Sequence, residues 1–289
     1  METIGLPLVV IVLTCLLIPS AASASGNAAR GEYMVRLGGC HSCHTESRNN
    51  SEPLAGGVAL TTPFGTFHVP NITPDAETGI GRWSDGDFIR AMTEGISPDG
   101  RHYYPAFPYT SYTRMTRQDL MDLKAYLNTL KPVRRKTPPH ELRFPYNLRA
   151  ALGIWKFLFF RKGDYTPDAI KSSSWNRGAY IVTGPAHCGE CHTRRNFLGA
   201  TVKNDALAGT RKGPDGGRIP NITPHPKEGI GLWSARDIAS FLKTGVPPFG
   251  EDVGDPMDKV ITNSTSKWTD EDLQAVTEYL RSLPASTTP

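Results

Sequence analysis

The sequence contains the pentapeptide Cys40-His41-Ser42-Cys43-His44 and, far downstream, a second one of the same pattern, Cys188-Gly189-Glu190-Cys191-His192. The shared spacing C-x-x-C-H is the signature of covalent haem c attachment. Two thiols separated by two residues can bond to neighbouring edges of one porphyrin, and the histidine that follows is then directed at the iron. The two motifs predict two covalently bound haem c groups, with His44 and His192 as the proximal iron ligands.

Three other uses of paired cysteines compete with haem attachment. Cys40, Cys43, Cys188 and Cys191 could bind a zinc ion through four thiolates, but such a site leaves the histidine of each motif without a role. Redox-active dithiols and structural disulfides are the remaining alternatives. Because a histidine follows the second cysteine in both motifs, covalent haem attachment through these four cysteines is the preferred interpretation.

The length and composition fit a folded protein of two domains. The chain has 289 residues, of which 38% are hydrophobic and 21% are charged, so nothing indicates disorder. Its formal net charge is only +4, and no basic run with interleaved aromatic residues occurs. Nucleic-acid binding is therefore not expected.

The N-terminus has the pattern of an exported protein. An almost uninterrupted apolar run from Gly5 to Ile18 is followed by Ala22-Ser23-Ala24, which fits the A-x-A rule for signal-peptide cleavage. We expect residues 1–24 to be a cleaved signal peptide and the mature chain to lie in the periplasm. Cleavage would remove Cys15 and leave only the four motif cysteines. No Lys or Arg precedes Arg30, so a retained N-terminal membrane anchor stays an alternative.

An internal repeat surrounds the two motifs. Short segments from the first part of the sequence recur in the same order in the second part, at a nearly constant offset, which indicates duplication of one ancestral domain. The matching segments are Arg30-Gly31-Glu32-Tyr33 and Arg177-Gly178-Ala179-Tyr180, Pro70-Asn71-Ile72-Thr73-Pro74 and Pro220-Asn221-Ile222-Thr223-Pro224, and Gly79-Ile80-Gly81-Arg82-Trp83-Ser84 and Gly229-Ile230-Gly231-Leu232-Trp233-Ser234.

The repeated unit has the pattern of a set of short helices. A helix with apolar residues at i, i+3, i+7 and i+10 closes each copy, and it begins after Thr116 in the first copy and after Thr269 in the second. The other predicted helices are Ala28–Leu37, Asp87–Thr93 after the N-cap Ser84, and Asp237–Lys243 after the N-cap Ser234. No alternating strand pattern occurs, and residues 53–66 are predicted to be a loop.

The predicted fold is all-α, with two tandem class I cytochrome c domains joined by a long linker. The predicted boundaries are residues 1–24 for the signal peptide, 25–131 for the first domain, 132–173 for the linker and 174–289 for the second domain. The linker begins with a basic, proline-rich stretch that should be extended and continues with an aromatic run from Phe144 to Phe160. That run either packs between the domains or forms an exposed apolar patch for a partner protein or a membrane surface.

The two copies differ at the expected sixth iron ligand. A low-spin electron-transfer haem usually has a methionine ahead of the C-terminal helix, and Met257 is the only methionine in that loop of the second copy. The equivalent position of the first copy holds Phe107, whose ring cannot ligate iron. His102, Met115 and Met92 are candidate substitutes, although both methionines are expected to be core residues. A first site without a protein ligand is the other alternative.

Two more kinds of residue recur near each motif. Trp83 and Trp233, like Asn71 and Asn221, carry side-chain N–H groups that can bond to a haem propionate oxygen. Alternatively, the asparagines shape turns and the indole rings fill the core. The sequence leaves both roles open.

These motifs together resemble the cytochrome c subunits of bacterial periplasmic and membrane-bound dehydrogenases, such as quinoprotein alcohol dehydrogenase and flavin-dependent gluconate dehydrogenase. The resemblance spans essentially the whole chain after residue 24, and its segments are Arg30–Thr45, Thr62–Thr66, Asn71–Pro74, Tyr104–Tyr112 and Phe144–Asn147. It implies that the two motifs bind haem c and that Met257 is a distal ligand. Many relatives have a third haem motif and a methionine in place of Phe107, whereas this sequence has two motifs.

The resemblance implies an electron-transfer protein rather than an enzyme. A dehydrogenase catalytic subunit would supply the electrons, and a downstream cytochrome or oxidase of the respiratory chain would accept them. Peripheral membrane association is compatible with this role. The alternative is a dihaem enzyme of the peroxidase or thiosulfate dehydrogenase type with an open first site. Such an enzyme needs an acid–base group, and between Arg101 and Arg117 the sequence offers only His102 and no acidic residue.

Overall fold

The computed structural model of the chain describes residues 1–2, 25–47, 51–213, 216–249, 254 and 256–289. The predicted signal peptide, apart from its first two residues, lies outside the described residues. Within the described part of the chain, no helix has both the length and the apolar character that crossing a membrane requires.

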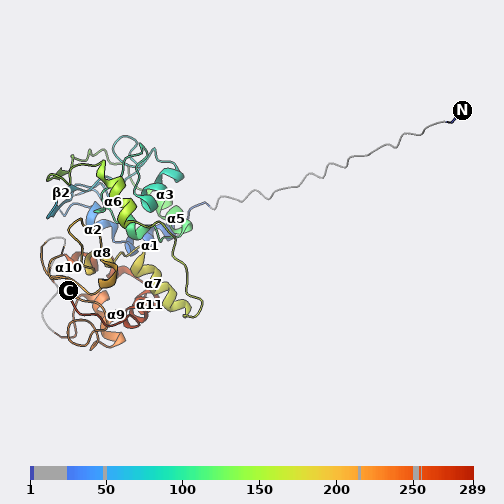
Figure 1. Cartoon of the computed structure of the whole chain (residues 1–289). Helices are drawn as coiled ribbons and strands as arrows, with labels where there is room; N and C mark the ends of the chain where they lie inside the picture. The colour runs from blue at the N-terminus through green and yellow to red at the C-terminus, as the bar shows by residue number, and fades with distance from the viewer. Residues whose placement is uncertain (3–24, 48–50, 214–215, 250–253, 255) are drawn as a thin grey trace.

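Two pairs of packed helices form the frame of the molecule, one pair in the first half (residues 25–131) and one in the second half (residues 173–289). The pairs are α1 (Ala28–Leu37) with α5 (Arg117–Leu127), and α7 (Ser173–Thr183) with α11 (Asp270–Arg281). Figure 1 shows the first half above the second, with α1 and α7 near the boundary between them. Thr116 and Thr269 cap α5 and α11, which confirms both predicted helix starts.

Each helix pair crosses at a glycine. Gly31 of α1 lies so close to α5 that an added Cβ would be 1.9 Å from the carbonyl oxygen of Asp122. In the second half, a Cβ on Gly178 of α7 would meet the carbonyl oxygen of Ala275 at the same distance of 1.9 Å. Any side chain at either position would force the helices apart. The glycine of the repeated Arg-Gly-x-Tyr segment is therefore required by the crossing.

A third pair of equivalent helices is α3 (Asp85–Glu94) and α9 (Ala235–Thr244). Ser84 and Ser234 begin them with capping boxes, in which the serine side chain accepts the N3 backbone N–H and the N3 aspartate accepts the serine N–H. Gly95 and Gly245 end them in the left-handed conformation. The predicted helices and both predicted N-caps are confirmed.

The fold is mostly helical, as predicted, but a small three-stranded antiparallel sheet corrects the prediction that the chain has no strands and that residues 53–66 form a loop. The strands β1 (Ala59–Thr62) and β2 (Gly65–His68) form a hairpin where a loop was predicted, and β3 (Glu141–Leu142) pairs with β2. Ala59 lies opposite His68 in the register of the hairpin. Strands this short carry too few residues for an alternating pattern, and the third strand comes from the linker, so pairing is decided by contacts between distant segments.

The aromatic run of the linker forms a helix that the sequence did not predict, α6 (Ala151–Phe159). Lys156 fixes it to the first half by donating to the carbonyls of Glu94 (2.6 Å) and Gly95 (2.7 Å) at the end of α3. Trp155 fixes it to the second half, because its indole N–H donates to the carbonyl of Leu198 (2.8 Å). The helix therefore contacts both halves.

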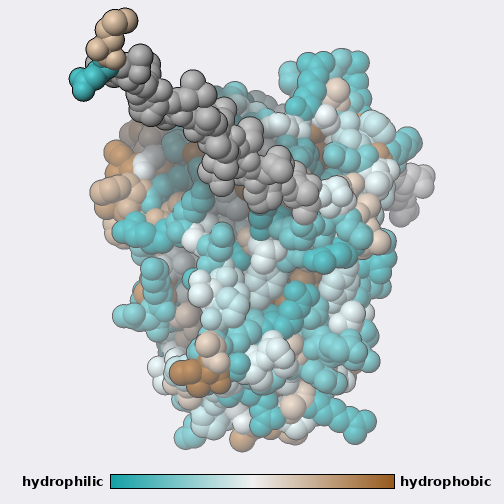
Figure 2. Space-filling view, turned by 90° about the vertical axis from the view of Figure 1, so that its right-hand side faces the viewer, coloured by the Kyte–Doolittle hydropathy of each residue, from teal (hydrophilic) through white to brown (hydrophobic). Residues whose placement is uncertain are grey.

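The outward face of this linker is apolar. The Phe144 and Phe157 side chains are each 78% exposed, and the Ile154 side chain is 66% exposed. A hydrophobic area lies at the upper left of Figure 2, at the height that α6 has in Figure 1. The helix thus contacts both halves through one face and exposes apolar side chains on the other. The predicted binding of a partner protein or a membrane surface to that exposed face stays a prediction.

One hydrophobic core runs through both halves. Its buried side chains include Leu37, Met115, Leu120, Ile181, Trp268 and Val276. A second, small cluster of Phe67, Tyr104 and Leu152 joins the sheet and α6 to the first half. The short helices that complete the fold are α2 (Cys40–His44), α4 (Tyr109–Tyr112), α8 (Gly189–His192), η1 (Lys203–Asp205), α10 (Met257–Asn263) and η2 (Thr265–Lys267).

Candidate haem-binding sites

The two C-x-x-C-H motifs form the short helices α2 and α8. A residue with a left-handed backbone precedes each first cysteine: Gly39 (φ 61°) before Cys40 and His187 (φ 42°) before Cys188. Glycine adopts this conformation without strain, whereas a histidine in it is strained. The chain therefore enters both motifs through the same kind of turn.

The cysteine geometry favours haem attachment over the alternatives. All four motif cysteines are described, and none of them forms a disulfide. Burial raises the pKa of the Cys40 and Cys188 thiols to about 12, so these thiols are protonated at neutral pH rather than poised as reactive dithiols. Among the described residues, no group of three or more His, Cys, Asp or Glu side chains is placed to hold a metal ion. A zinc site built from the four cysteines is therefore not formed.

The two motif histidines are oriented in the same way. Nδ1 of His44 lies 2.8 Å from the carbonyl oxygen of Pro70, and Nδ1 of His192 lies 2.8 Å from that of Pro220. A carbonyl can only accept, so Nδ1 carries the proton and Nε2 keeps its lone pair for a metal. Burial lowers the pKa of His44 to about 4 and lowers that of His192, so both imidazoles are neutral, as iron ligation requires. The residues present therefore fit a proximal haem ligand in each half.

A repeated glycine holds the loop that carries these carbonyls. The Gly56 N–H donates to the His44 carbonyl (2.7 Å), and the Gly209 N–H donates to the His192 carbonyl (2.8 Å). An added Cβ on Gly56 would lie 2.6 Å from the Pro70 backbone, so no larger residue fits there. No role was predicted for either glycine, although Leu-Ala-Gly at residues 54–56 recurs at residues 207–209 and marks both of them in the sequence.

The repeated asparagines anchor the same loops to the end of each half. The Asn71 side-chain amide donates to the Val133 carbonyl (2.6 Å), and the Asn221 amide donates to the Ser286 carbonyl (2.6 Å). Each asparagine oxygen accepts the backbone N–H of the threonine two residues on, at 2.9 Å for Asn71 and 2.8 Å for Asn221. These contacts explain the repeated Pro-Asn-Ile-Thr-Pro segment as the support of the proximal histidine. A contact with a haem propionate stays a prediction.

The repeated tryptophans keep their indole donors available. Trp83 and Trp233 are half-buried and pack against the main core. Neither indole N–H bonds to any residue that the structure describes, whereas the indoles of Trp155, Trp175 and Trp268 all have acceptors. A propionate contact for Trp83 and Trp233 remains a prediction, which a free donor supports.

The predicted distal position differs in structure between the halves. Met257 is the half-buried first residue of α10. Residues 250–253 and 255, which precede it, lie outside the described part. Phe107 instead packs among aromatic rings, with centroid distances of 5.6 Å to Tyr103 and 5.7 Å to the buried Tyr112. The position thus holds a flexible thioether in one half and part of a packed aromatic cluster in the other.

The other candidate ligands of the first half lie in different surroundings. Met115 is 2% exposed and precedes the N-cap of α5, where it occupies the place that Trp268 has before α11. Met92 is buried on α3. Nε2 of His102 would lie 3.6 Å from a Cβ on Gly153 of α6, and its Nδ1 is buried without a hydrogen-bond partner among the described residues.

The two motif helices make reciprocal contacts across the boundary between the halves. Glu190, in the second motif, accepts from Thr110 (2.7 Å) and Ser111 (2.8 Å) of α4 in the first half. Ser42, in the first motif, donates to the carbonyl of Lys259 (3.2 Å) in α10 of the second half. Each motif therefore contacts a short helix of the other half that begins at the predicted distal position (α10, at Met257) or two residues after it (α4, after Phe107).

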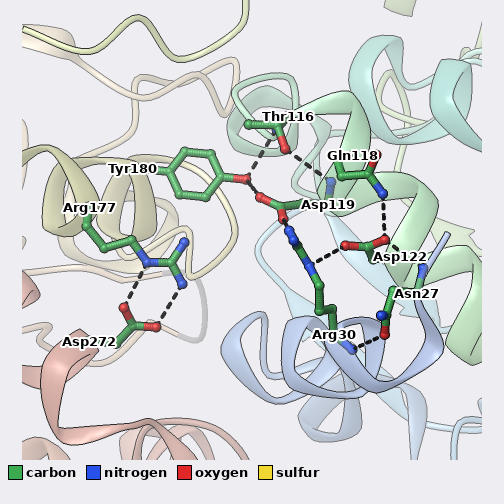
Figure 3. A network of polar contacts seen from close by, with 9 residues as sticks. All are labelled: Asn27, Arg30, Thr116, Gln118, Asp119, Asp122, Arg177, Tyr180 and Asp272. Atoms are coloured by element: carbon green, nitrogen blue, oxygen red, sulfur yellow. Dashed lines mark hydrogen bonds and ion pairs between the residues drawn. The ribbon is translucent and has the colours of Figure 1, made fainter. Parts of the chain in front are cut away.

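A second reciprocal pair involves the repeated tyrosines. The Tyr180 hydroxyl of α7 donates to the Asp119 carboxylate of α5 (2.5 Å), a contact that Figure 3 shows. The Tyr33 hydroxyl of α1 donates to the Asp272 carboxylate of α11 (2.7 Å). Each carboxylate also pairs with an arginine of its own half. Asp119 lies 3.3 Å from Arg30, and Asp272 lies 2.8 Å from Arg177. Both tyrosines belong to the repeated Arg-Gly-x-Tyr segment, but no pattern in the sequence identifies the aspartates that bind them.

Comparison with known proteins agrees with this geometry. Residues 28–131 match the family model described as cytochrome c. The chain is 46% identical to "Diheme cytochrome c-type" of Cereibacter sphaeroides, over 91% of this chain and 88% of the relative. It is 40% identical to "Alcohol dehydrogenase (quinone), cytochrome c subunit" of Komagataeibacter europaeus and 35% identical to "Gluconate 2-dehydrogenase cytochrome c subunit" of Pantoea cypripedii.

The extent of these matches separates the relatives. The last two alignments cover 92% and 89% of this chain but only 57% and 59% of the relatives, so the chain spans somewhat more than half of their length. The Cereibacter protein is matched over most of its length. With its covalent attachment motifs, its oriented histidines and a relative this similar over both chains, the chain belongs to the cytochrome c family.

Proposed function

We propose that the chain is a dihaem c-type cytochrome that carries electrons in the periplasm. It would take them from a dehydrogenase catalytic subunit and pass them to a cytochrome or oxidase of the respiratory chain, without substrate chemistry of its own. We further propose that its halves are two tandem class I cytochrome c domains that arose by duplication. One of the relatives reported above is named as a dihaem cytochrome and two are named as cytochrome c subunits of dehydrogenases, which supports this role.

The observation that carries the proposal is the equivalence of the two proximal sites. Each half has two motif cysteines that form no disulfide, a histidine whose Nδ1 faces a proline carbonyl, and a glycine and an asparagine that hold that carbonyl in place. A single site of this kind would suit many haem proteins. Two of them in one chain, with each motif helix in contact with the other half, suit a carrier that moves electrons along the molecule.

The chain's own residues would bind and orient each group. Cys40 and Cys43 would hold one haem covalently, and Cys188 and Cys191 the other. His44 and His192 would ligate the iron through Nε2, and Met257 would be the distal ligand of the second site. When bound, haem supplies one-electron redox chemistry, and the buried core around the motifs limits the access of water.

Haem content tests the number of sites. We expect the purified chain to carry two haems, measured as haem absorbance against protein concentration. Cys188→Ser/Cys191→Ser should leave one, and the matched variant Cys40→Ser/Cys43→Ser should also leave one. A wild-type ratio of one haem per chain would contradict the proposal.

Activity separates the carrier from a dihaem enzyme. The oxidised chain should become reduced when a periplasmic dehydrogenase and its substrate are added, and it should show no turnover with hydrogen peroxide or thiosulfate alone. Substantial turnover without a partner subunit would support the enzyme alternative, in which an open first site reacts directly.

A further inference from the structure

The outer face of the linker forms an exposed apolar surface that no described contact explains. We call it the α6 patch, and its residues are Phe144, Leu148, Ile154, Phe157, Leu158, Phe197 and Leu198. Their exposed fractions run from 38% for Leu198 to 80% for Phe197. Contiguous apolar surface of this kind marks a site of interaction. Figure 2 shows the hydrophobic area at the height of α6.

The scaffold holds this surface outward. Lys156 points inward from α6 to the carbonyls at the end of α3, and its ammonium lies 4.6 Å from the ring centre of Tyr109. Leu152, one turn before Lys156, is buried in the small cluster. With one face fixed in this way, the side chains of Ile154 and Phe157 cannot turn into the core. Their exposure is therefore a property of the folded molecule.

The second half extends the patch. The Trp155 indole bonds to the Leu198 carbonyl, and the Tyr146 hydroxyl lies 3.5 Å from the carbonyl oxygen of Phe197. Phe197 and Leu198 follow the second haem motif by only a few residues. The patch thus lies across both halves, beside the loop that leaves His192.

The linker segment that carries most of the patch is basic. From Leu142 to Lys162 the chain has five basic residues and no Asp or Glu: Arg143, Arg149, Lys156, Arg161 and Lys162. Arg161 donates to the carbonyls of Phe157 and Phe160 at the end of α6 and so lies at the margin of the patch. Arg143, Arg161 and Lys162 are exposed, whereas Lys156 points inward and Lys162 also pairs with Glu94 (2.6 Å). The surface thus combines protruding aromatic and aliphatic side chains with exposed cations at its margin.

We propose that the α6 patch docks the protein on the surface of an anionic lipid bilayer. A helix that lies in the interface places its Phe, Ile and Leu side chains among the acyl chains and its cations beside the lipid phosphates. Protruding side chains suit a deformable bilayer, which needs no matching cavity. The charge pattern matches anionic headgroups. This proposal does not depend on the electron-transfer function.

Vesicle binding tests the proposal. The haem-loaded chain, with the N-terminus that it has in its host, is sedimented with vesicles of phosphatidylcholine alone or mixed equally with phosphatidylglycerol. We expect binding to the anionic vesicles, and we expect Ile154→Ser/Phe157→Ser to weaken it about tenfold, because two inserted apolar side chains are lost. Added salt should weaken binding of the wild type.

The matched control is Leu232→Ser, which removes a 71% exposed leucine from the loop before α9 in the second half. It should bind like the wild type, and both variants should keep the wild-type haem absorbance. Equal binding of the wild type and the double variant would overturn the proposal. So would a double variant that loses affinity for a dehydrogenase subunit while its vesicle binding is unchanged, because the patch would then be a protein interface.

Discussion

The distal segments of the two halves are built differently around proximal sites that are nearly the same. His44 and His192 each face a proline carbonyl at 2.8 Å. On the predicted distal side, the first half has the half-buried ring of Phe107 among Tyr103 and Tyr112, and the second half has Met257 at the start of a separate helix.

The difference shows which part of such a site is constrained. The proximal side has to meet a fixed spacing of two thiols and one histidine, so its loop, glycine and asparagine recur in both halves. The distal side needs one ligand atom at most, which a change at a single position can supply or remove. We therefore expect the two haems to differ in ligation and in reduction potential.

Replacing Met257 should have the largest effect, a change in the reduction potential of the second haem. Met257→Phe makes the second site resemble the first, and we expect the second haem to lose its thioether ligand. Its reduction potential should fall by roughly 0.2 V, within the ~0.8 V range that axial ligands control. Redox titration followed by absorbance measures the change.

The control for this variant is Met121→Leu, which alters a buried methionine on α5. It should leave both potentials unchanged. If Met257→Phe also leaves them unchanged, Met257 is not a ligand.

The reverse substitution, Phe107→Met, should make the first site resemble the second. Phe107→Met should give the first haem a methionine ligand and raise its potential by a similar amount, roughly 0.2 V. EPR of the oxidised protein should then show two low-spin species. Met115→Leu is the control and should not change the spectrum, since Met115 is a 2% exposed core residue. A spectrum that changes with Met115→Leu would identify Met115 as the ligand.

The two tyrosine contacts allow a comparison of stability. Tyr180→Phe removes the hydroxyl that bonds to Asp119 in the buried interior, and it should lower the free energy of unfolding by about 1.5–3 kcal/mol. Tyr33→Phe should cost about 1 kcal/mol, because Tyr33 is half-buried and Asp272 keeps two bonds from Arg177. Urea unfolding of the haem-loaded protein measures both. A larger cost for Tyr33→Phe would reverse this ranking.

Lowering the pH should weaken the Tyr33–Asp272 contact, and its effect on the free energy of unfolding should be smaller than that of the tyrosine substitutions. Burial alone would raise the pKa of Asp272, but the hydrogen bonds from Arg177 and Tyr33 outweigh it and hold the pKa below its usual value. A carboxylate with a lowered pKa stabilises the folded state above its unfolded pKa and loses that contribution as the pH falls through its folded pKa. Asp272→Asn should therefore flatten the acid side of the stability profile. An unchanged slope would show that Asp272 does not contribute.

The sequence predicted the parts of the fold that depend on local patterns. Serine and threonine N-caps marked the starts of α3, α5, α9 and α11, and the residues of α1 were predicted as the structure has them. The haem motifs and the family resemblance also came from short, specific spacings. In each case the information lies within about a dozen neighbouring residues.

The parts that were missed depend on contacts between distant segments. β2 pairs with β3, a strand of the linker. The inward face of α6 carries Lys156, whose ammonium is buried and bonds to two carbonyls at the end of α3. Tyr33 and Asp272 are separated by most of the chain, and no local pattern links them. The roles assigned to Asn71 and Asn221 were also incomplete, because their carbonyl partners lie beyond the last helix of each half.

The reciprocal tyrosine–aspartate pairs affect how the chain reaches its final state. Tyr33 belongs to the first helix and Asp272 to the last, so this contact cannot form until the whole polypeptide has emerged and folded. Asp119 likewise waits for Tyr180. Assembly therefore ends with a joining step that neither half can complete alone, and a chain cut short before α11 would keep an unfinished surface on its first helix.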